Sequence, residues 1–116
     1  MQAILQSQGI HHITLNGADR KTSIGFWQDV LGMKLIFEQP NLDDATENHL
    51  YFDCGDGRTV TIFTNESRTG KTDPLDTSVG SVHHLAFWVS QSTIRIAEKK
   101  LKEKGIGSSG IKDRGF

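Results

Sequence analysis

The chain lacks the features that define several common protein classes. It has a single cysteine, Cys54, among 116 residues, so no intrachain disulfide can form and we expect a cytoplasmic protein. The net charge of -1 gives no basic surface, which argues against nucleic acid as a partner. No apolar run approaches the ~18 residues that cross a bilayer, and the first residues do not resemble a signal peptide, so we expect no membrane partner. With 116 residues the chain is too short for two independent cores, and we expect one domain over residues 1–116.

Histidine is also scarce, but its placement follows a pattern. Four of the five histidines form two doublets, in "GIHHITL" at residues 9–15 and in "SVHHLAFWV" at residues 81–89. The neighbouring side chains are mostly β-branched or apolar, which predicts a strand in both segments. Because apolar side chains are expected at most strand positions, both doublets are candidate functional positions.

The first doublet opens a pattern of one helix and four strands. Residues 10–15 are predicted to form a strand, and Asp19 is a candidate N-cap for the helix that follows, which Gly32 ends. The apolar side chains of this helix recur at helical spacing at Ile24, Trp27, Val30 and Leu31. Three further strands are predicted at residues 34–39, 49–54 and 59–64, the last two joined by the tight turn "GDGR". Module one, about residues 9–64, is therefore expected to be βαβββ.

A shorter copy of this pattern follows a linker at about residues 65–80. Residues 82–89 are expected to form a strand, and Ser90 or Ser92 to cap a helix that ends near Gly105. From the second histidine of the doublet to the closing glycine there are 20 residues in the first copy (12 to 32) and 21 in the second (84 to 105). This spacing indicates an internal repeat, in which module two covers about residues 81–116.

The fold class predicted from these patterns is α+β, built from paired βαβββ modules. Module one needs about 55 residues and module two has 36, so module two is expected to be truncated by roughly 20 residues at its C-terminal end. Either residues are missing from the sequence, or another chain supplies the edge of the sheet. Pairing of the two modules within one chain and pairing between chains are both open.

Strand alternation separates the two histidines of each doublet. His12 shares a face with Thr14, whereas His11 shares the opposite face with apolar neighbours. In the second strand, His84 lies with the small Ala86, and His83 lies on the apolar face. If the two modules pair through their sheets, His12 and His84 converge on a shared concave surface.

Two neutral imidazoles from different strands are good ligands for iron, manganese, zinc or nickel. A lone histidine in a strand is more often a hydrogen-bonded core or edge residue. The recurrence of histidine at equivalent positions of the repeat instead favours the interpretation of His12 and His84 as metal ligands. A third ligand is needed, and a carboxylate would complete a common arrangement with open positions. The strand at residues 59–64 offers none, so we expect the carboxylate beyond Phe116, in the missing segment.

The residues resemble the vicinal oxygen chelate superfamily, which includes glyoxalases, bleomycin-resistance proteins, fosfomycin-resistance enzymes and extradiol dioxygenases. The resemblance rests on "IHHITL", "FWQDVLGMKL", "HLYFDCGDG" and "VHHLAFWV", and covers residues 9–64 and 81–116. It implies a glyoxalase-like fold and places the two histidine ligands at His12 and His84. The glutamate ligand of the family has no counterpart in these 116 residues.

The doublets, "HLYF" and the terminal "KDRGF" look most like the hydroquinone-type extradiol ring-cleaving dioxygenases. This likeness implies a metal-dependent dioxygenase with iron(II), or alternatively manganese(II), acting on a dihydroxylated aromatic. It also places four residues near the substrate, namely His11, His83, Thr14 and Arg114. Those enzymes usually have four modules in a chain, so we expect a homodimer here.

Two other interpretations are open. The same scaffold could support a glyoxalase-like lyase or isomerase, or a thiol transferase for antibiotic resistance, with zinc or nickel as the metal of the glyoxalase-like case. A protein of another class would bind a drug in a dimer cleft without metal, as bleomycin-resistance proteins do, with Trp88 as a stacking surface. Metal analysis separates these classes.

Overall fold

The computed structural model describes residues 4–69 and 76–115. The chain divides into two compact units, Met1–Thr72 and Asp73–Phe116, and each unit is described by itself. No helix in the described ranges is long and apolar enough to cross a membrane.

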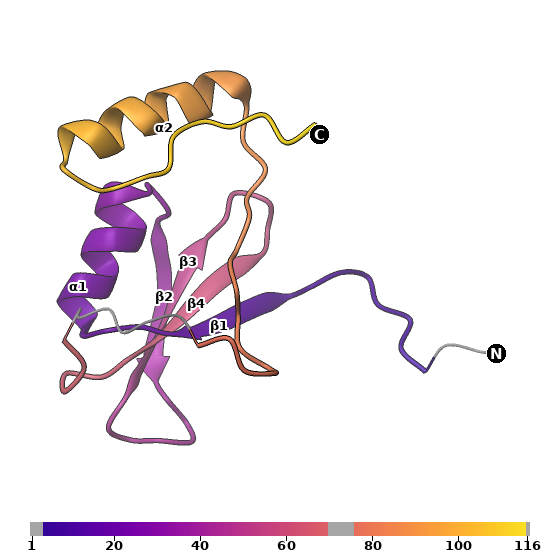
Figure 1. Ribbon diagram of the computed structural model, residues 1–116. Helices are drawn as coiled ribbons and strands as arrows, with labels where there is room; N and C mark the ends of the chain where they lie inside the picture. The colour runs from indigo at the N-terminus through magenta and orange to yellow at the C-terminus, as the bar shows by residue number, and fades with distance from the viewer. Residues whose placement is uncertain (1–3, 70–75, 116) are drawn as a thin grey trace. The chain divides into compact units, whose positions relative to one another are not determined.

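The first unit is a four-stranded sheet with one interrupted helix (Figure 1). Its elements are β1 (His12–Asn16), α1 (Arg20–Ile24), η1 (Gly25–Val30), β2 (Leu35–Pro40), β3 (Asn48–Asp53) and β4 (Thr59–Thr64). The strand order is β1-β4-β3-β2, with β1 parallel to β4 and the other neighbours antiparallel. The α+β class and the βαβββ order expected for module one are confirmed, with strand ends within two residues of the predicted ones.

The core of this unit lies on one face of the two central strands. Leu50 and Phe52 of β3 pair with Ile62 and Val60 of β4, and all four side chains are buried. Trp27 of η1 packs on Phe52 with ring centroids 6.2 Å apart, so the helix covers this face. Because side chains alternate along a strand, the intervening residues of β3 and β4 lie on the opposite face.

The helix begins and ends where the sequence predicts, but its second half differs. The carboxylate of Asp19 accepts a hydrogen bond from the Thr22 amide at 2.7 Å, and this bond lowers the pKa of Asp19. Gly32 ends the helix with φ 78°, a conformation that glycine adopts without strain. Residues Gly25–Val30 are wound as a π-helix rather than the expected α-helix. The wider turn rotates the last residues, and Leu31, expected on the apolar face, is 40% exposed.

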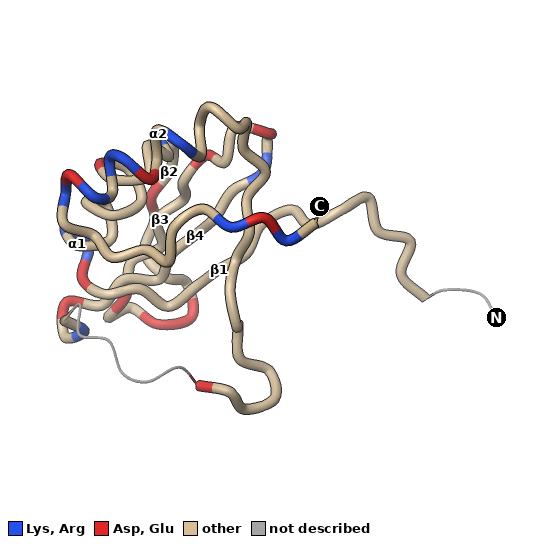
Figure 2. Tube along the Cα trace, turned by 45° about the horizontal axis from the view of Figure 1, so that its top comes forward, with Lys and Arg blue, Asp and Glu red and all other residues tan. Residues whose placement is uncertain are grey.

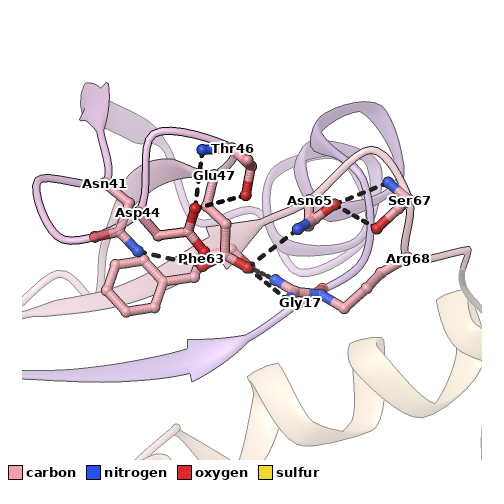
Figure 3. Close-up of polar contacts among 9 residues, drawn as sticks. All are labelled: Gly17, Asn41, Asp44, Thr46, Glu47, Phe63, Asn65, Ser67 and Arg68. Carbon is pink, nitrogen blue, oxygen red and sulfur yellow. Dashed lines mark hydrogen bonds and ion pairs between the residues drawn. The ribbon is translucent and has the colours of Figure 1, made fainter.

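The guanidinium group of Arg68 forms hydrogen bonds to several segments at one end of the sheet (Figure 3). Arg68 donates to the carbonyl oxygens of Gly17 and Phe63 at 2.7 and 2.9 Å, and forms an ion pair with Glu47 at 2.6 Å. This ion pair lowers the pKa of Glu47, with further hydrogen bonds from Asn65 and Asn41. Arg68 thereby joins the chain after β1, the chain after β4 and the loop before β3.

Among residues 76–115, which the structure describes, the second unit contains one helix, α2 (Gln91–Glu103). Ser90 is its N-cap and accepts a hydrogen bond from the Thr93 amide at 3.1 Å, which confirms one of the two predicted caps. Several basic residues lie along α2, as the colouring of the trace in Figure 2 shows. Lys100 and Lys102 lie in the last turn of the helix, where their positive charge interacts favourably with the negative end of the helix dipole. Beyond Gly105 the chain runs back beside the helix, where the Ile111 amide donates to Glu98 at 2.9 Å (Figure 1).

The prediction of a strand at residues 82–89 is wrong for this structure. Residues 81–90 form neither strand nor helix. A strand requires a neighbour that completes its hydrogen-bond ladder, and no other described segment pairs with these residues. Their apolar side chains are correspondingly exposed, with Val82 at 55% and Trp88 at 99%. The apolar pattern led to the prediction of a strand, but no segment of the described residues pairs with residues 82–89.

Candidate functional site

The face of the first sheet opposite the helix carries polar and aromatic side chains. Register places His12 beside Thr59 and Thr14 beside Thr61, while Tyr51 of β3 faces Thr61 from the other side. His49, two residues before Tyr51, shares this face. We call this set the polar face; its members used below are His12, Thr14, Gln39, His49, Tyr51 and Thr61.

A continuous series of hydrogen bonds crosses the polar face from β2 to β1. Gln39 Nε2 donates to the Tyr51 hydroxyl at 3.1 Å, and that hydroxyl lies 3.0 Å from His49 Nδ1. His49 Nε2 lies 2.8 Å from Thr61 Oγ1, which lies 2.6 Å from Thr14 Oγ1. Thr61 is fully buried, and the other members are partly buried. The network therefore links all four strands through side chains alone.

His49 sits among aromatic rings at the centre of this network. Its ring centroid lies 4.3 Å from that of Tyr51 and 4.5 Å from that of Phe63, and Phe37 packs on Tyr51 at 5.2 Å. Burial lowers the pKa of His49, and the nearby His12 lowers it further. This lowering of the pKa favours the neutral imidazole, in which one nitrogen donates and the other accepts.

Sequence reasoning did not select His49 as a site residue. The signal was the alternation in "HLYF", where His49 and Tyr51 alternate with the buried Leu50 and Phe52. That alternation predicts a shared face for the histidine and the tyrosine. Their hydrogen-bond partners come from other strands, which local patterns do not reveal.

The two histidines of the first doublet lie closer together than strand alternation predicts. His11 was expected on the opposite face, but its Nδ1 lies 2.8 Å from Nδ1 of His12, with ring centroids 5.0 Å apart. The reason is that β1 begins at His12, so His11 is outside the hydrogen-bonded ladder that enforces alternation. In a neutral pair only one of these two Nδ1 atoms carries the shared proton.

The second unit repeats this geometry. His83 Nδ1 and His84 Nδ1 are also 2.8 Å apart, with ring centroids at 5.0 Å, and both side chains are exposed. His83, expected on an apolar strand face, is instead turned toward His84 because residues 81–90 form no strand. Arg114 lies in the same unit, in a depression formed with Ile94 and Leu101 of α2.

The structure thus groups the predicted site residues by unit. His11, His12 and Thr14 lie in the first unit, and His83, His84 and Arg114 lie in the second. The pairing of His12 with His84 stays a prediction. Across residues 4–69 and 76–115, no three or more His, Cys, Asp or Glu side chains cluster as a metal site.

The donor chemistry at His12 fits a divalent metal. Its contact with His11 uses only Nδ1, and within the described part of the first unit its Nε2 makes no hydrogen bond. The ring is exposed on the polar face, where an imidazole nitrogen can bind iron, manganese, zinc or nickel. His84 is likewise exposed, and within the described part of the second unit it contacts His83 only through Nδ1.

A model of the Glyoxalase/Bleomycin resistance protein/Dioxygenase superfamily matches residues 9–115. The chain belongs to this superfamily. The match spans both histidine doublets, and it confirms the resemblance inferred from the sequence motifs.

One relative within the superfamily is "Putative ring-cleaving dioxygenase MhqE" from Bacillus subtilis (strain 168), which is 29% identical over 114 residues. The aligned part is 88% of this chain and 38% of MhqE, so the chain spans little more than a third of that relative.

Two solved structures share the fold. The crystal structure of SMU.1112c has a TM-score of 0.71 at 23% identity, over 93% of this chain and 83% of the other. A FosX mutant from Listeria monocytogenes, a fosfomycin resistance protein complexed with Mn(II), has a TM-score of 0.65 at 18% identity, over 95% of this chain and 79% of the other.

Proposed function

We propose that this chain belongs to a metal-dependent, extradiol-type ring-cleaving dioxygenase that acts on a dihydroxylated aromatic. The observation that carries the proposal is the exposed imidazole of His12 on the polar face. Its Nδ1 contacts His11, and its Nε2 makes no hydrogen bond to the described residues of the first unit. The description of MhqE supports the reaction class, although this chain spans only 38% of that relative. Iron(II) is the metal we favour, with manganese(II) as the alternative.

The chain's own residues have distinct roles in this proposal. In this proposal His12 and His84 each supply one imidazole nitrogen to the metal, and a carboxylate supplies the third ligand. A bound divalent metal supplies Lewis acidity and, in the case of iron, one-electron redox capacity. If His12 donates its Nδ1 proton to His11, the Nε2 lone pair of His12 points away for binding, so His11 sets the tautomer of the ligand.

The rest of the polar face suits an aromatic diol. The rings of Phe37, Tyr51 and Phe63 provide an apolar wall on which an aromatic ligand can stack. The Thr14 hydroxyl lies two residues from His12 on the same face and can bond to a ligand oxygen. Arg114, in the second unit, is proposed to stabilise a developing anion through its permanent charge. We further propose that the protein is cytoplasmic and that it forms a homodimer; sedimentation of the purified protein tests the dimer.

Metal affinity is the first test of this function. We expect the full chain to bind Mn(II) or, without oxygen, Fe(II) in equilibrium dialysis, and His12→Ala or His84→Ala to weaken binding at least 100-fold. His11→Ala is the matched control, because it removes a neighbour of the ligand rather than the ligand, and should cost about tenfold, at the low end of the effect of losing such a neighbour. Equal losses in all three variants would overturn the ligand assignment.

Oxygen uptake is the second test. With metal bound, we expect oxygen consumption in the presence of catechol or hydroquinone. Metal binding without oxygen uptake by any diol would overturn the dioxygenase proposal in favour of a lyase, isomerase or thiol transferase. A wild-type protein that binds no metal at saturating Mn(II) or Fe(II) would leave the metal-free drug-binding alternative.

A further inference from the structure

The hydrogen bonds across the polar face have a direction, which follows from the donors and acceptors present. Gln39 approaches Tyr51 through its amide nitrogen, which can only donate, so the phenolic oxygen accepts this bond. The phenolic proton is then directed to the second partner of Tyr51 among the described residues, His49 Nδ1, 3.0 Å away. Tyr51 thus accepts on one side and donates on the other.

The imidazole of His49 accepts at one ring nitrogen and donates at the other. Because His49 Nδ1 accepts from Tyr51, a neutral ring carries its proton on Nε2. That nitrogen lies 2.8 Å from Thr61 Oγ1 and donates to it. The neutral form is the one that burial favours at this position.

In the hydrogen bond between the two threonines, Thr61 is the donor and Thr14 is the acceptor. A hydroxyl has one proton, and Thr61, which accepts from His49, has Thr14 Oγ1 as its other side-chain partner at 2.6 Å. Thr61 is fully buried, so its proton has no alternative in solvent. Thr14 therefore accepts from Thr61, and its own proton is free to point outward from the polar face.

The opposite direction satisfies the groups less well. It would require Tyr51 to accept from both Gln39 and His49, which leaves the phenolic proton without a partner among the described residues. In the forward direction the unpaired proton is instead that of Thr14, at the end of the network. A phenol is a stronger hydrogen-bond donor than an aliphatic hydroxyl, so leaving the Tyr51 proton unpaired costs more free energy than leaving the Thr14 proton unpaired.

We propose that Gln39, Tyr51, His49 and Thr61 are positioning residues that hold the Thr14 hydroxyl as an outward hydrogen-bond donor. The group it would select is an acceptor oxygen without a proton, such as a phenolate or enolate, and it would disfavour ligand groups that can only donate. The identity of the ligand as an aromatic diolate rests on the proposed function, but the direction of the network does not.

The tautomer of His49 tests the direction without metal or ligand. In ¹⁵N–¹H correlation spectra of the full chain, we expect His49 to be the Nε2–H tautomer. Gln39→Glu replaces the donating amide with an isosteric acceptor, which should reverse the network and convert His49 to the Nδ1–H tautomer. Glu38→Gln, the opposite change at the neighbouring residue, is the matched control and should leave the His49 signals unchanged.

A second variant guards against misfolding of the first. Tyr51→Phe keeps the ring and removes the hydroxyl that donates to His49, and should yield a mixture of both tautomers. An Nδ1–H tautomer in the wild-type chain, or an unchanged His49 tautomer in both variants, would overturn the proposal.

Ligand binding tests the role of Thr14. For the Mn(II)-loaded protein we expect Thr61→Val to weaken binding of 4-nitrocatecholate about tenfold, as loss of an oriented charge-assisted hydrogen bond implies, and Thr61→Ser to retain it. Both variants should bind Mn(II) as the wild type does, which a general structural defect would not allow. Equal affinity of Thr61→Val and wild type for the catecholate would overturn the donor role. If the wild type binds no metal, the proposed function fails while the tautomer result still decides the direction.

Discussion

Gly17 lies where the chain leaves β1 and meets the buried face of β4, and one added methyl group there should destabilise the first unit. A Cβ atom built on Gly17 would overlap Cγ2 of Ile62 and lie 3.0 Å from Ser23 Oγ. Ile62 is 1% exposed and Ser23 is 4% exposed, so neither has open space to move into. The backbone angle of Gly17 is not in the positive-φ region, so alanine adds no backbone strain and the cost in the folded state comes from the overlap.

The backbone at Gly17 cannot easily relieve this overlap. Its amide donates to the Phe63 carbonyl at 2.9 Å, and its own carbonyl accepts from Arg68 Nε at 2.7 Å (Figure 3). Moving the chain would therefore break bonds on both sides. Overpacking of a closed core costs about 1–3 kcal/mol, and the pinned backbone places Gly17→Ala in the upper half of that range, partly offset by about 0.4–1 kcal/mol of lost unfolded-state entropy. The net expectation is about 2 kcal/mol.

The assay is urea unfolding followed by the fluorescence of Trp27, in a Trp88→Phe background so that a single indole reports on the first unit. Gly25→Ala is the matched control, because Gly25 is helical with φ -56° and nothing lies within 4 Å of an added Cβ there. It should be neutral or stabilising by up to about 1 kcal/mol.

Second-site substitutions identify the clash. Ile62→Leu removes the branch methyl Cγ2 and should rescue Gly17→Ala by about 1 kcal/mol in a double-mutant cycle, whereas Ile62→Val keeps Cγ2 and should rescue it little. A cost for Gly17→Ala no larger than that of Gly25→Ala, or equal rescue by leucine and valine, would refute the steric reasoning.

Two further predictions concern the stability of the same unit. Burial lowers the pKa of His49 below its ordinary value of 6.5, so the stability that it contributes is complete above pH 6.5 and is lost as pH falls through its lower folded pKa. His49→Gln should therefore flatten the decline in unfolding free energy between pH 7 and about pH 5, and an unchanged slope in urea titrations would contradict this. Arg68→Lys keeps the charge near Glu47 but cannot reach both carbonyl oxygens, so the midpoint of thermal unfolding should fall by about 5 °C. A melting curve identical to that of the wild type would show that the two carbonyl bonds contribute nothing.

Sequence patterns that span a few residues predicted the helix cap, the helix end and the strands of the first unit, because these features depend on interactions between near neighbours in the chain. The N-cap at Asp19 and the helix end at Gly32 follow from one side chain and one backbone preference each. The β3 and β4 strands follow from strand-forming residues on either side of the tight turn "GDGR", and alternation placed His12 and Thr14 together on one face. The superfamily motifs span both units and led to the family that the comparison confirms.

The parts that were missed depend on partners distant in sequence. His49 became a site residue because Thr61, 12 residues away on β4, lies beside it in register. His11 turned toward His12 because the ladder with β4 begins at His12, and the start of a ladder depends on both strands. Residues 82–89 have the composition of a strand, but a strand forms only where another segment completes its hydrogen bonds.

The sequence by itself determined the order of elements in the first unit, the two histidine doublets and the family, because capping, turn chemistry and alternation act over a few residues. Only the tertiary structure decided which polar groups meet, since the network from Gln39 to Thr14 uses residues from all four strands. The direction of that network is set by pairwise donor and acceptor chemistry at distances of 2.6–3.1 Å. Such distances arise only when separate strands are placed side by side.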